Sequence, residues 1–436
     1  MTASAEHRPP EDRPPENRPP EDRPPEDHPP EDHPPEDHPG EGHPPGSQAP
    51  EDQAPGSQAA ADRPPDERRK MTVSERSVGD LGAALEGWLA ARLGHPEELA
   101  VSGVRVPGSG GLSSTSVLFE ASWAAAGARR HGAYVARMAP EASAVPVFPG
   151  YDLPGQFEVI SQVAARSAVP LPRLRWNEPD DGPLGTAFFV MDQVDGRVPL
   201  DNPPYVFTGW LLEATDAERA RLQRASIGVL ARVHAIPGAA AAFGSLCPPG
   251  GKDSLRWHFE QQQDYYRWAL AGDGLRVPII ERSLAWLEEH WPSGRGPDVL
   301  CWGDARIGNI IYQGFEPAAV LDWEMASLGP RELDVGWFVF LHRFFQDIAD
   351  FFGVPGLPGF LRRSDVERCY QELAGCALRD MDFYLVYAAV RHAIVMARIK
   401  RRMIHFGEDE VPAERDDYVL HRASLEQMLA GSYGWD

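Results

Sequence analysis

The chain is organised around residues 299–312, which read Val-Leu-Cys-Trp-Gly-Asp-Ala-Arg-Ile-Gly-Asn-Ile-Ile-Tyr, and residues 319–324, which read Ala-Val-Leu-Asp-Trp-Glu. Apolar runs around the polar residues predict short strands joined by a loop and a hairpin. Asp304 is followed after five residues by Asn309, and Asp322 comes thirteen residues later. A single Asp beside Gly is usually a turn residue. Three polar groups set between apolar strands, however, would be costly to bury without a ligand.

An acid, an amide and a second acid are the groups that phosphoryl transfer requires. One carboxylate orients an attacking hydroxyl and accepts its proton, while an amide oxygen and another carboxylate hold magnesium, which bridges phosphate oxygens. Magnesium is a hard ion that prefers oxygen ligands, so Asn and Asp suit it better than His or Cys. The two stretches therefore predict a phosphotransferase.

The chain resembles the aminoglycoside phosphotransferase family of kinase-like small-molecule kinases. It is most similar to the branch related to the kinase-like domains of acyl-CoA dehydrogenase fusion proteins. The resemblance covers roughly residues 80–405 and rests on two paired loops at their mutual spacing. The positions that match the family motifs are Gly303, Asp304, Asn309, Asp322, Gly329, Pro330 and Asp334.

This resemblance implies a role for each of these residues. Asp304 is expected to be the catalytic base, Asn309 and Asp322 to hold magnesium, and ATP to be the phosphoryl donor. Arg306 either contacts phosphate or substrate as part of the catalytic site or is a plain surface residue. Asp334 is expected to brace the catalytic loop. The residues expected to bind the nucleotide are Gly108, Ser109, Gly110, Gly111, Ser113, Ser114, Arg137, Gln156, Asp192 and Val194.

Three positions depart from the family pattern. Trp302 replaces the usual histidine before the Gly-Asp pair, so any hydrogen bond that braces the backbone there must be made otherwise. Arg137 replaces the strand lysine; arginine can still bind phosphate, but its planar fork differs from an ammonium point charge. The glutamate that usually pairs with this cation would fall at Gln156, and Glu158 would point elsewhere on a helix.

Two further residues have alternative interpretations. Glu324 lies two residues after Asp322 and, on a strand, would face the same side. It either assists magnesium binding or has no role in it. His234 is expected to pack a helix, with a direct role in the site as the alternative.

The order of elements predicts an α+β chain with a protein-kinase-like bilobal fold. Residues 76–194 form the expected small, β-rich N-lobe, and residues 195–436 form the larger helical C-lobe. The glycine-rich loop joins two strands and lacks the Lys-Ser/Thr pair of a P-loop. Ser77 is expected to cap the first helix, and Thr215 with Glu218 a later one. Strands are expected at 101–106, 117–122, 133–138 and 187–194, and helices at 81–93, 156–165, 222–233, 279–290, 335–345, 363–377 and 383–404.

Residues 1–75 are expected to be a disordered tail. A pentapeptide of the type Arg-Pro-Pro-Glu-Asp repeats from Arg8 to Glu67, and residues 1–70 hold 19 of the 43 prolines. Paired prolines forbid helix, and the segment has almost nothing apolar to bury. We interpret it as a solvated spacer rather than a histidine array that binds metal. Met71 follows directly, which leaves open whether the array belongs to the native protein.

Composition argues against several classes of protein. The net charge is −23 and neither the tail nor the rest is basic, which argues against a nucleic-acid partner. No apolar run of about 18 residues is present, so no membrane span or secretory signal is expected. The four cysteines are scattered, against a disulfide framework or structural zinc site. We expect a cytoplasmic, soluble protein of open oligomeric state.

The leading hypothesis is an ATP- and magnesium-dependent kinase of a small-molecule hydroxyl compound. A non-catalytic nucleotide-binding pseudokinase or scaffold is the alternative. A protein kinase is disfavoured because no Ala-Pro-Glu segment follows Asp322. GTP in place of ATP stays open, as does the acceptor, which is either an aminoglycoside-type antibiotic or an anionic hydroxy acid or hydroxyacyl-CoA. The basic run 398–402, with Arg391 and His392, suits an anion if it faces the cleft.

Overall fold

The computed structural model describes residues 77–107, 114–180, 182–271 and 274–436, so the pentapeptide array lies outside the described residues. An antiparallel sheet of five strands, in the order β1-β2-β3-β5-β4, forms the first described part. Its strands are β1 (Ala100–Arg105), β2 (Thr115–Ala125), β3 (Ala128–Met138), β4 (Leu174–Glu178) and β5 (Phe188–Asp192). β2 and β3 form a long hairpin that pairs Thr115 with Met138 at its open end. β3 then pairs with β5, which places Arg137 opposite Phe189.

Helix α2 (Val78–Leu93) forms as the sequence predicts. The Ser77 side chain accepts a hydrogen bond from the Asp80 N–H, and Gly94 ends the helix at φ +73°. Leu81, Leu85, Trp88 and Leu89 are buried and pack against the sheet. A small apolar core is thereby enclosed between α2 and the sheet.

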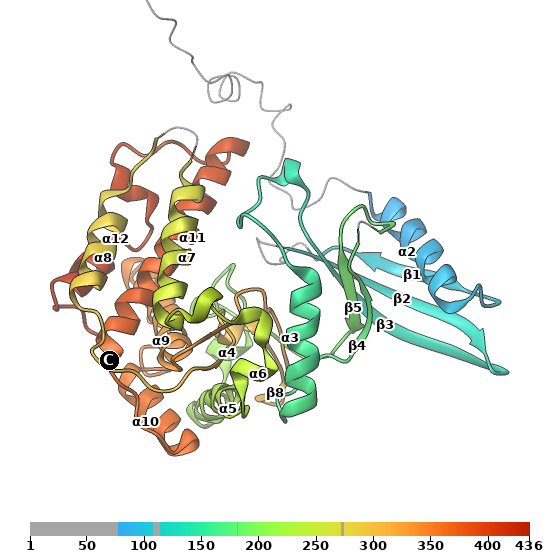
Figure 1. The fold of residues 1–436 in the computed structure, drawn as a ribbon, viewed down its shortest axis with the longest axis horizontal. Coiled ribbons are helices and arrows are strands. Elements are labelled where there is room, and N and C mark those ends of the chain that lie inside the picture. Colours follow the sequence, from blue (N-terminus) through green and yellow to red (C-terminus); the bar gives the residue numbers. More distant parts are fainter. Residues whose placement is uncertain (1–76, 108–113, 181, 272–273) are drawn as a thin grey trace, which may run out of the picture. The chain divides into compact units, whose positions relative to one another are not determined.

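Helix α3 (Leu153–Arg166) lies between the sheet and the helices that follow it (Figure 1). Its apolar face, which includes Val159, Ile160 and Val163, belongs to the large core of the helical part rather than to the small core under α2. Phe157 also packs edge-on against Phe189 of β5. α3 therefore connects β5, whose Phe189 lies opposite Arg137, to the helical part.

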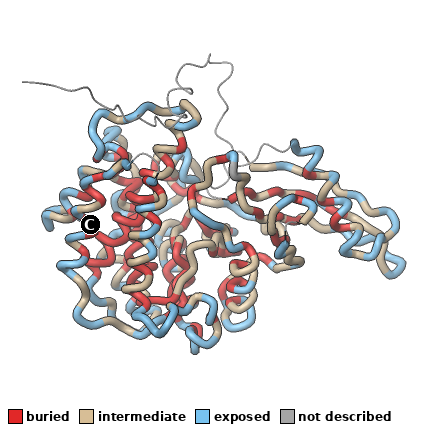
Figure 2. Tube along the Cα trace, turned by 45° about the horizontal axis from the view of Figure 1, so that its top comes forward, coloured by how far each residue is buried: buried red, intermediate tan, exposed pale blue. Residues whose placement is uncertain are grey.

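The helical part is built on two long buried helices. α9 (Glu332–Phe351) and α11 (Met381–Phe406) pack together, and buried residues cover most of α9 and of the first half of α11, as expected of helices inside a core. A Cβ at Gly336 would lie 2.9 Å from the Tyr384 carbonyl oxygen, so glycine permits their close approach. Figure 2 shows buried positions running through this interior while the loop tips are exposed. The other helices are α4 (Trp210–Glu213), α5 (Asp216–His234), α6 (Ala239–Ala242), α7 (Ser254–Ala269), α8 (Pro278–Glu289), α10 (Arg363–Ala374) and α12 (Arg422–Leu429).

Two small antiparallel pairs of strands contain or flank the motif residues of 299–312 and 319–324. β6 (Val299–Cys301) pairs with β9 (Ser327–Gly329), and β7 (Ile310–Gln313) forms a hairpin with β8 (Glu316–Val320). A single 3-10 turn, residues 307–309, leads into β7. The loops after β6 and after β8 meet, since Trp302 Nε1 donates to the carbonyls of Leu321 and Asp322.

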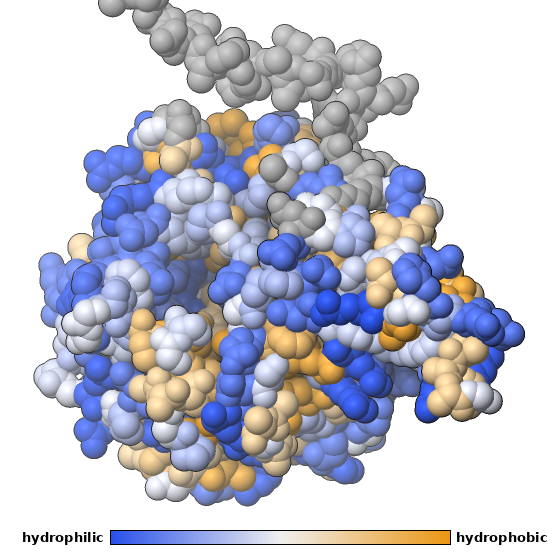
Figure 3. Space-filling view, turned by 45° about the vertical axis from the view of Figure 1, so that its right-hand side comes forward, coloured by the Kyte–Doolittle hydropathy of each residue, from blue (hydrophilic) through white to orange (hydrophobic). Residues whose placement is uncertain are grey.

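The expected α+β architecture, a small β-rich lobe followed by a larger helical one, is confirmed. The capping box of Thr215 and Glu218 at the start of α5 is also present. β4, α7 and α12 were not predicted, and β2 and β3 are longer than expected. Among the described residues, no helix combines the length and apolar composition needed to cross a membrane. Figure 3 shows one face of the molecule, on which apolar areas lie among hydrophilic residues.

Candidate active site

The loop that follows β6 is held by one buried carboxylate. Asp334, in the first turn of α9, has no exposed surface. Its oxygens accept hydrogen bonds from the backbone N–H of Trp302 at 2.6 Å and of Gly303 at 2.9 Å. The His234 Nε2–H donates to the same carboxylate at 3.0 Å, and His234 Nδ1 accepts from the Tyr370 hydroxyl at 2.7 Å. Asp334 therefore braces the loop, as the resemblance implied, and His234 supports that brace from the α5 side.

Gly303 brings this loop against the segment that follows Asp322. Its φ is +92°, and a Cβ there would lie 2.0 Å from the Met325 carbonyl oxygen. Any other residue would collide with that backbone. The Gly303 carbonyl accepts a hydrogen bond at 3.2 Å from Arg391, whose guanidinium also lies over the Trp337 ring at 4.5 Å.

Asp304 projects from this loop as a carboxylate with hydrogen bonds to both oxygens. Oδ1 accepts from Trp337 Nε1 at 2.8 Å, and Oδ2 accepts from Asn309 Nδ2 at 2.6 Å and Arg306 Nε at 3.0 Å. Burial alone would raise the pKa of Asp304, but the Arg306 charge and these hydrogen bonds outweigh burial and hold the pKa below its usual value. The carboxylate is therefore ionised at neutral pH, as a general base must be.

Arg306 is clamped between two carboxylates rather than exposed on the surface. Its Nε contacts Asp304 and its Nη1 contacts Asp201, which precedes α4. Burial alone would lower the pKa of Arg306, but both carboxylates raise it above its usual value. Asp201 was not predicted, because no motif marks either Asp in the segment 195–209. The plain surface interpretation of Arg306 is thus wrong for the geometry observed.

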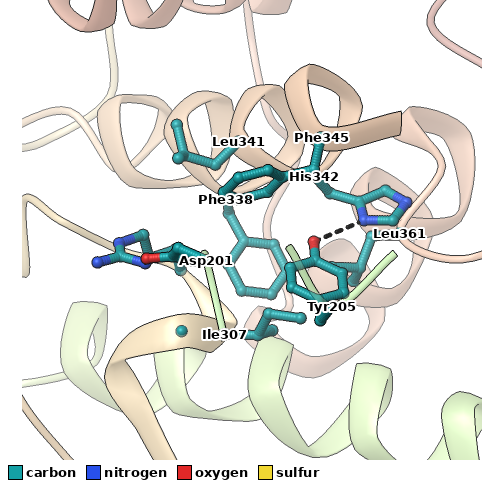
Figure 4. Close-up of a pocket in the computed structure, with 10 residues that line it drawn as sticks. Asp201, Tyr205, Ile307, Phe338, Leu341, His342, Phe345 and Leu361 are labelled. Carbon is teal, nitrogen blue, oxygen red and sulfur yellow. Dashed lines mark hydrogen bonds and ion pairs between the residues drawn. The ribbon is translucent and has the colours of Figure 1, made fainter. Parts of the chain in front are cut away.

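A small crevice, with a cavity volume of about 10 Å³, lies beside this arginine (Figure 4). Asp201 and Arg306 stand at one side, and apolar side chains of α9 such as Phe338 and Phe345 form the wall. The Tyr205 hydroxyl donates to His342 Nδ1 at 2.8 Å, and His342 Nε2–H donates to the Leu357 carbonyl. The crevice is smaller than a typical ligand pocket, and its polar side chains already have partners.

Asn309 and Asp322 are joined through the backbone. The Leu321 N–H donates to the Asn309 carbonyl at 2.8 Å, and Trp302 Nε1 donates to the carbonyls of Leu321 and Asp322 at 2.8 and 3.1 Å. Trp302 stands where the family has a histidine, and its indole supplies the hydrogen bonds that brace this backbone. Asp322 has φ +59°, which turns its side chain out of the strand direction.

Arg137 reaches across to this second loop. Its Nη2 lies 2.7 Å from Asp322 Oδ1 and 3.6 Å from Glu324 Oε2, and it is largely buried. Burial alone would lower its pKa, but these two carboxylates raise it. Gln156 is buried on α3, whereas Glu158 is exposed and accepts a hydrogen bond from Gln162. Neither α3 residue is the recorded partner of Arg137, so the expected pairing with the helix is corrected to Asp322 and Glu324.

Glu324 does not lie on a strand. Residues 322–326 form a turn between β8 and β9, in which the Ala326 N–H donates to the Trp323 carbonyl at 3.1 Å. The prediction that Glu324 and Asp322 face the same side because they alternate along a strand is therefore wrong about the strand. Both carboxylates nevertheless face Arg137, because the turn brings them to the same guanidinium.

The expected nucleotide-binding residues are only partly visible. The loop residues Gly108, Ser109, Gly110, Gly111 and Ser113 lie outside the described residues. Ser114 is described, and its Oγ is buried without a hydrogen-bond partner among the described residues. The Asp192 carboxylate pairs with Arg175, and its N–H donates to the Arg173 carbonyl. That backbone groups of Asp192 and Val194 bind the adenine edge stays a prediction.

The basic run of α11 does not form a free cationic surface. Arg391 and Arg402 are buried, and Arg398 donates to the Pro146 carbonyl at 2.7 Å and lies over the Trp268 ring. Lys400 pairs with Asp409, and Arg401 donates to the Ala269 carbonyl. The charges were expected either to face the cleft or to lie on a solvated helix face. They instead bond within the helical part and, through Arg398, to the segment between β3 and α3.

The donor chemistry of Asn309 and Asp322 suits magnesium. Asn309 gives both of its recorded amide N–H bonds to Asp304, so its amide oxygen is the atom it can offer a cation. Asp322 adds a carboxylate, and hard oxygen donors are those that magnesium prefers. No group of three or more His, Cys, Asp or Glu residues that could hold a metal occurs in the described part of the chain.

Comparison with known proteins agrees with this arrangement. The profile of the phosphotransferase enzyme family matches residues 110–373. Probable acyl-CoA dehydrogenase IBR3 of Arabidopsis thaliana is 24% identical over 268 residues, which cover 57% of this chain and 31% of that protein. Ethanolamine kinase 2 of Homo sapiens is 30% identical over 129 residues, which cover 29% of this chain and 32% of that protein. The chain thus spans about a third of the length of these relatives.

Among solved structures, that of the "putative aminoglycoside phosphotransferase" of Ralstonia eutropha JMP134 aligns with a TM-score of 0.54 at 21% identity. The alignment covers 80% of this chain and 97% of that chain. At this identity the likeness concerns the fold, which is the kinase-like bilobal α+β fold that the sequence predicted.

Proposed function

The chain belongs to the phosphotransferase enzyme family, and we propose that it transfers the terminal phosphoryl group of ATP to a hydroxyl of a small molecule in a magnesium-dependent reaction. One observation carries the proposal. Asp304 is an ionised carboxylate held by Trp337, Arg306 and Asn309, and Asn309 is in turn joined to the Asp322 loop. A base and a pair of magnesium ligands are thereby supported by one hydrogen-bonded unit.

The roles of the side chains follow from their chemistry. Asp304 orients the acceptor hydroxyl and accepts its proton as the oxygen attacks the terminal phosphorus. Arg306 fixes the direction of this carboxylate and supplies positive charge beside it. Asn309 and Asp322 would hold magnesium, which supplies neutralisation of phosphate charge when it is bound. Arg137 offers a guanidinium to the phosphates from the opposite side of the site.

A non-catalytic nucleotide-binding protein is the alternative that the sequence raised. It was motivated by Trp302, Arg137 and Gln156, which replace the usual family residues. The Trp302 indole takes over a bracing role, since it donates to the Asp322 carbonyl, and Arg137 has two carboxylate partners. Trp302 and Arg137 thus make hydrogen bonds and ion pairs of their own in place of those of the usual residues. This supports a catalytic site over a non-catalytic one.

The acceptor class is proposed from the relatives rather than from charge. The basic residues of α11 bond to other groups of the protein, so their charge no longer favours an anionic acceptor. The similarity to acyl-CoA dehydrogenase IBR3 makes hydroxyacyl-CoA thioesters and hydroxy acids the first acceptors to test. The similarity to ethanolamine kinase 2 adds amino alcohols, and the family resemblance adds aminoglycosides.

The test is ATP consumption over a panel of these four acceptor classes, with the phosphorylated product identified by mass spectrometry. We expect turnover with one class that requires magnesium and is lost in Asp304→Asn. Aminoglycosides as the sole acceptors would restore antibiotic modification as the function. No turnover with any hydroxyl compound, together with tight ATP binding, would favour the non-catalytic alternative.

A further inference from the structure

Arg137 is a buried cation whose usual partner is missing. Its guanidinium ends an apolar strand, β3, and a charge in this position is costly to bury unless a carboxylate faces it. α3 offers Gln156 on its buried face, and an amide carries no charge. Glu158 lies on the exposed face of α3 and bonds to Gln162. The carboxylate that fixes Arg137 must therefore come from another element.

The loop after β8 supplies two candidates. Arg137 Nη2 lies 2.7 Å from Asp322 Oδ1 and 3.6 Å from Glu324 Oε2, and the three side chains are 13%, 14% and 10% exposed. The Arg137 guanidinium thus faces two carboxylates. A divalent cation would take its ligand from one carboxylate of the pair and leave the other to the guanidinium.

We propose that Glu324 is the positioning partner of Arg137 and takes the place of the helix glutamate that this chain lacks. The inference rests on the proposed function and deepens it. Asp322 follows Leu321, whose N–H donates to the Asn309 carbonyl, so a magnesium ion held by Asn309 would draw on Asp322. Arg137 then keeps Glu324 as its counter-charge, which holds the guanidinium at the phosphates instead of on Asp322.

The backbone around Glu324 is suited to this task. Met325 follows it directly, and the Met325 carbonyl packs so closely on Gly303 that a Cβ there would lie 2.0 Å away. The Ala326 N–H closes the turn onto the Trp323 carbonyl. The contact between Met325 and Gly303 that positions Asp304 therefore also holds Glu324. It fixes the position of the Glu324 carboxylate relative to Arg137.

The competing role for Glu324 is direct binding of magnesium. The two roles differ in what they require. A positioning partner acts only through Arg137, so its effect vanishes when Arg137 loses its charge. A magnesium ligand acts with or without Arg137. A double-mutant cycle between these residues therefore separates the two roles.

The experiment compares the full-length parent with Glu324→Gln, Arg137→Gln and the double variant, and uses Glu316→Gln as the matched control. Glu316 begins β8, the strand that precedes the turn with Glu324, is exposed and pairs with the surface residue Arg221. ATP affinity is measured by calorimetry with and without magnesium, and the magnesium concentration at half-saturation is measured for each protein. Glu324→Asp, which keeps the charge, is the second variant if Glu324→Gln does not fold.

We expect Glu324→Gln to weaken ATP binding by on the order of tenfold, while Glu316→Gln leaves it unchanged. In the Arg137→Gln background the second substitution should change ATP affinity and the magnesium requirement by less than about twofold. A tenfold rise in the magnesium requirement in that background, or parental affinity in Glu324→Gln, would overturn the inference. A parent protein that binds no ATP would instead refute the proposed function.

Discussion

Replacing Asp334 with Asn tests how the catalytic loop is held. The carboxylate accepts three hydrogen bonds, from the N–H groups of Trp302 and Gly303 and from His234 Nε2–H, at 2.6, 2.9 and 3.0 Å. An asparagine has one acceptor oxygen and one NH₂ group. At least one of the three donors must then face another donor in a site that has no exposed surface.

The cost follows from these contacts. A buried N–H left without an acceptor costs about 1–3 kcal/mol, and hydrogen bonds to a charged acceptor are stronger than those to a neutral amide. We therefore expect the free energy of unfolding to fall by about 2–4 kcal/mol. At about 2 °C for each kcal/mol in a domain of this size, Tm should fall by about 4–8 °C. A displaced Asp304 should also lower kcat by on the order of 10²-fold.

Thermal unfolding followed by circular dichroism, together with ATP turnover, checks both effects. Asp382→Asn is the control, because Asp382 also lies in the first turn of a long helix, α11, but is 80% exposed and pairs only with Arg363 among its recorded contacts. That variant should melt within about 1 °C of the parent. If Asp334→Asn melts like the control and keeps its kcat, the bracing role of Asp334 is refuted.

Two further predictions concern the same framework. Trp302→Phe keeps the ring and removes the indole N–H that serves the Leu321 and Asp322 carbonyls, so the magnesium concentration at half-saturation of ATP turnover should rise while Tm falls by a few degrees; an unchanged magnesium requirement would contradict the bracing role. Burial lowers the pKa of His342 and of His421 to about 4, below the value near 6.5 of an unfolded histidine. The unfolded state therefore binds more protons between about pH 6.5 and 4, and stability is lost as the pH falls through that range, by up to about 3 kcal/mol for each histidine. His421→Gln, which does not titrate, should show a shallower loss of Tm between pH 7 and 5, and the same slope as the parent would count against this account.

Local signals in the sequence predicted much of the fold. Ser77 and Gly94 mark the two ends of α2, and Thr215 with Glu218 starts α5, because these caps depend on residues three or four positions apart. The bracing role of Asp334 also followed from its motif. β4 and α7 were not predicted: β4 is a short edge strand with mixed burial, and α7 is polar over much of its length.

The partners of the site residues could not be predicted, because they come from distant parts of the chain. Asp201 reaches Arg306 across more than a hundred residues, and Arg391 reaches the Gly303 carbonyl across 88. Nothing in the neighbourhood of either residue in the sequence marks it. The same holds for Arg137, whose carboxylates lie 185 and more residues away and replace the expected partner on α3.

The most direct test of the central claim is phosphoryl transfer by the parent and Asp304→Asn under matched conditions. Both proteins are given radiolabelled ATP, magnesium and the best acceptor from the panel, and ATP binding is measured in parallel. We expect the parent to label the acceptor, and Asp304→Asn to bind ATP within about threefold of the parent while transferring the label about 10²–10⁴-fold more slowly. Equal rates of transfer in the two proteins would contradict the assignment of Asp304 as the base, and with it the proposed site.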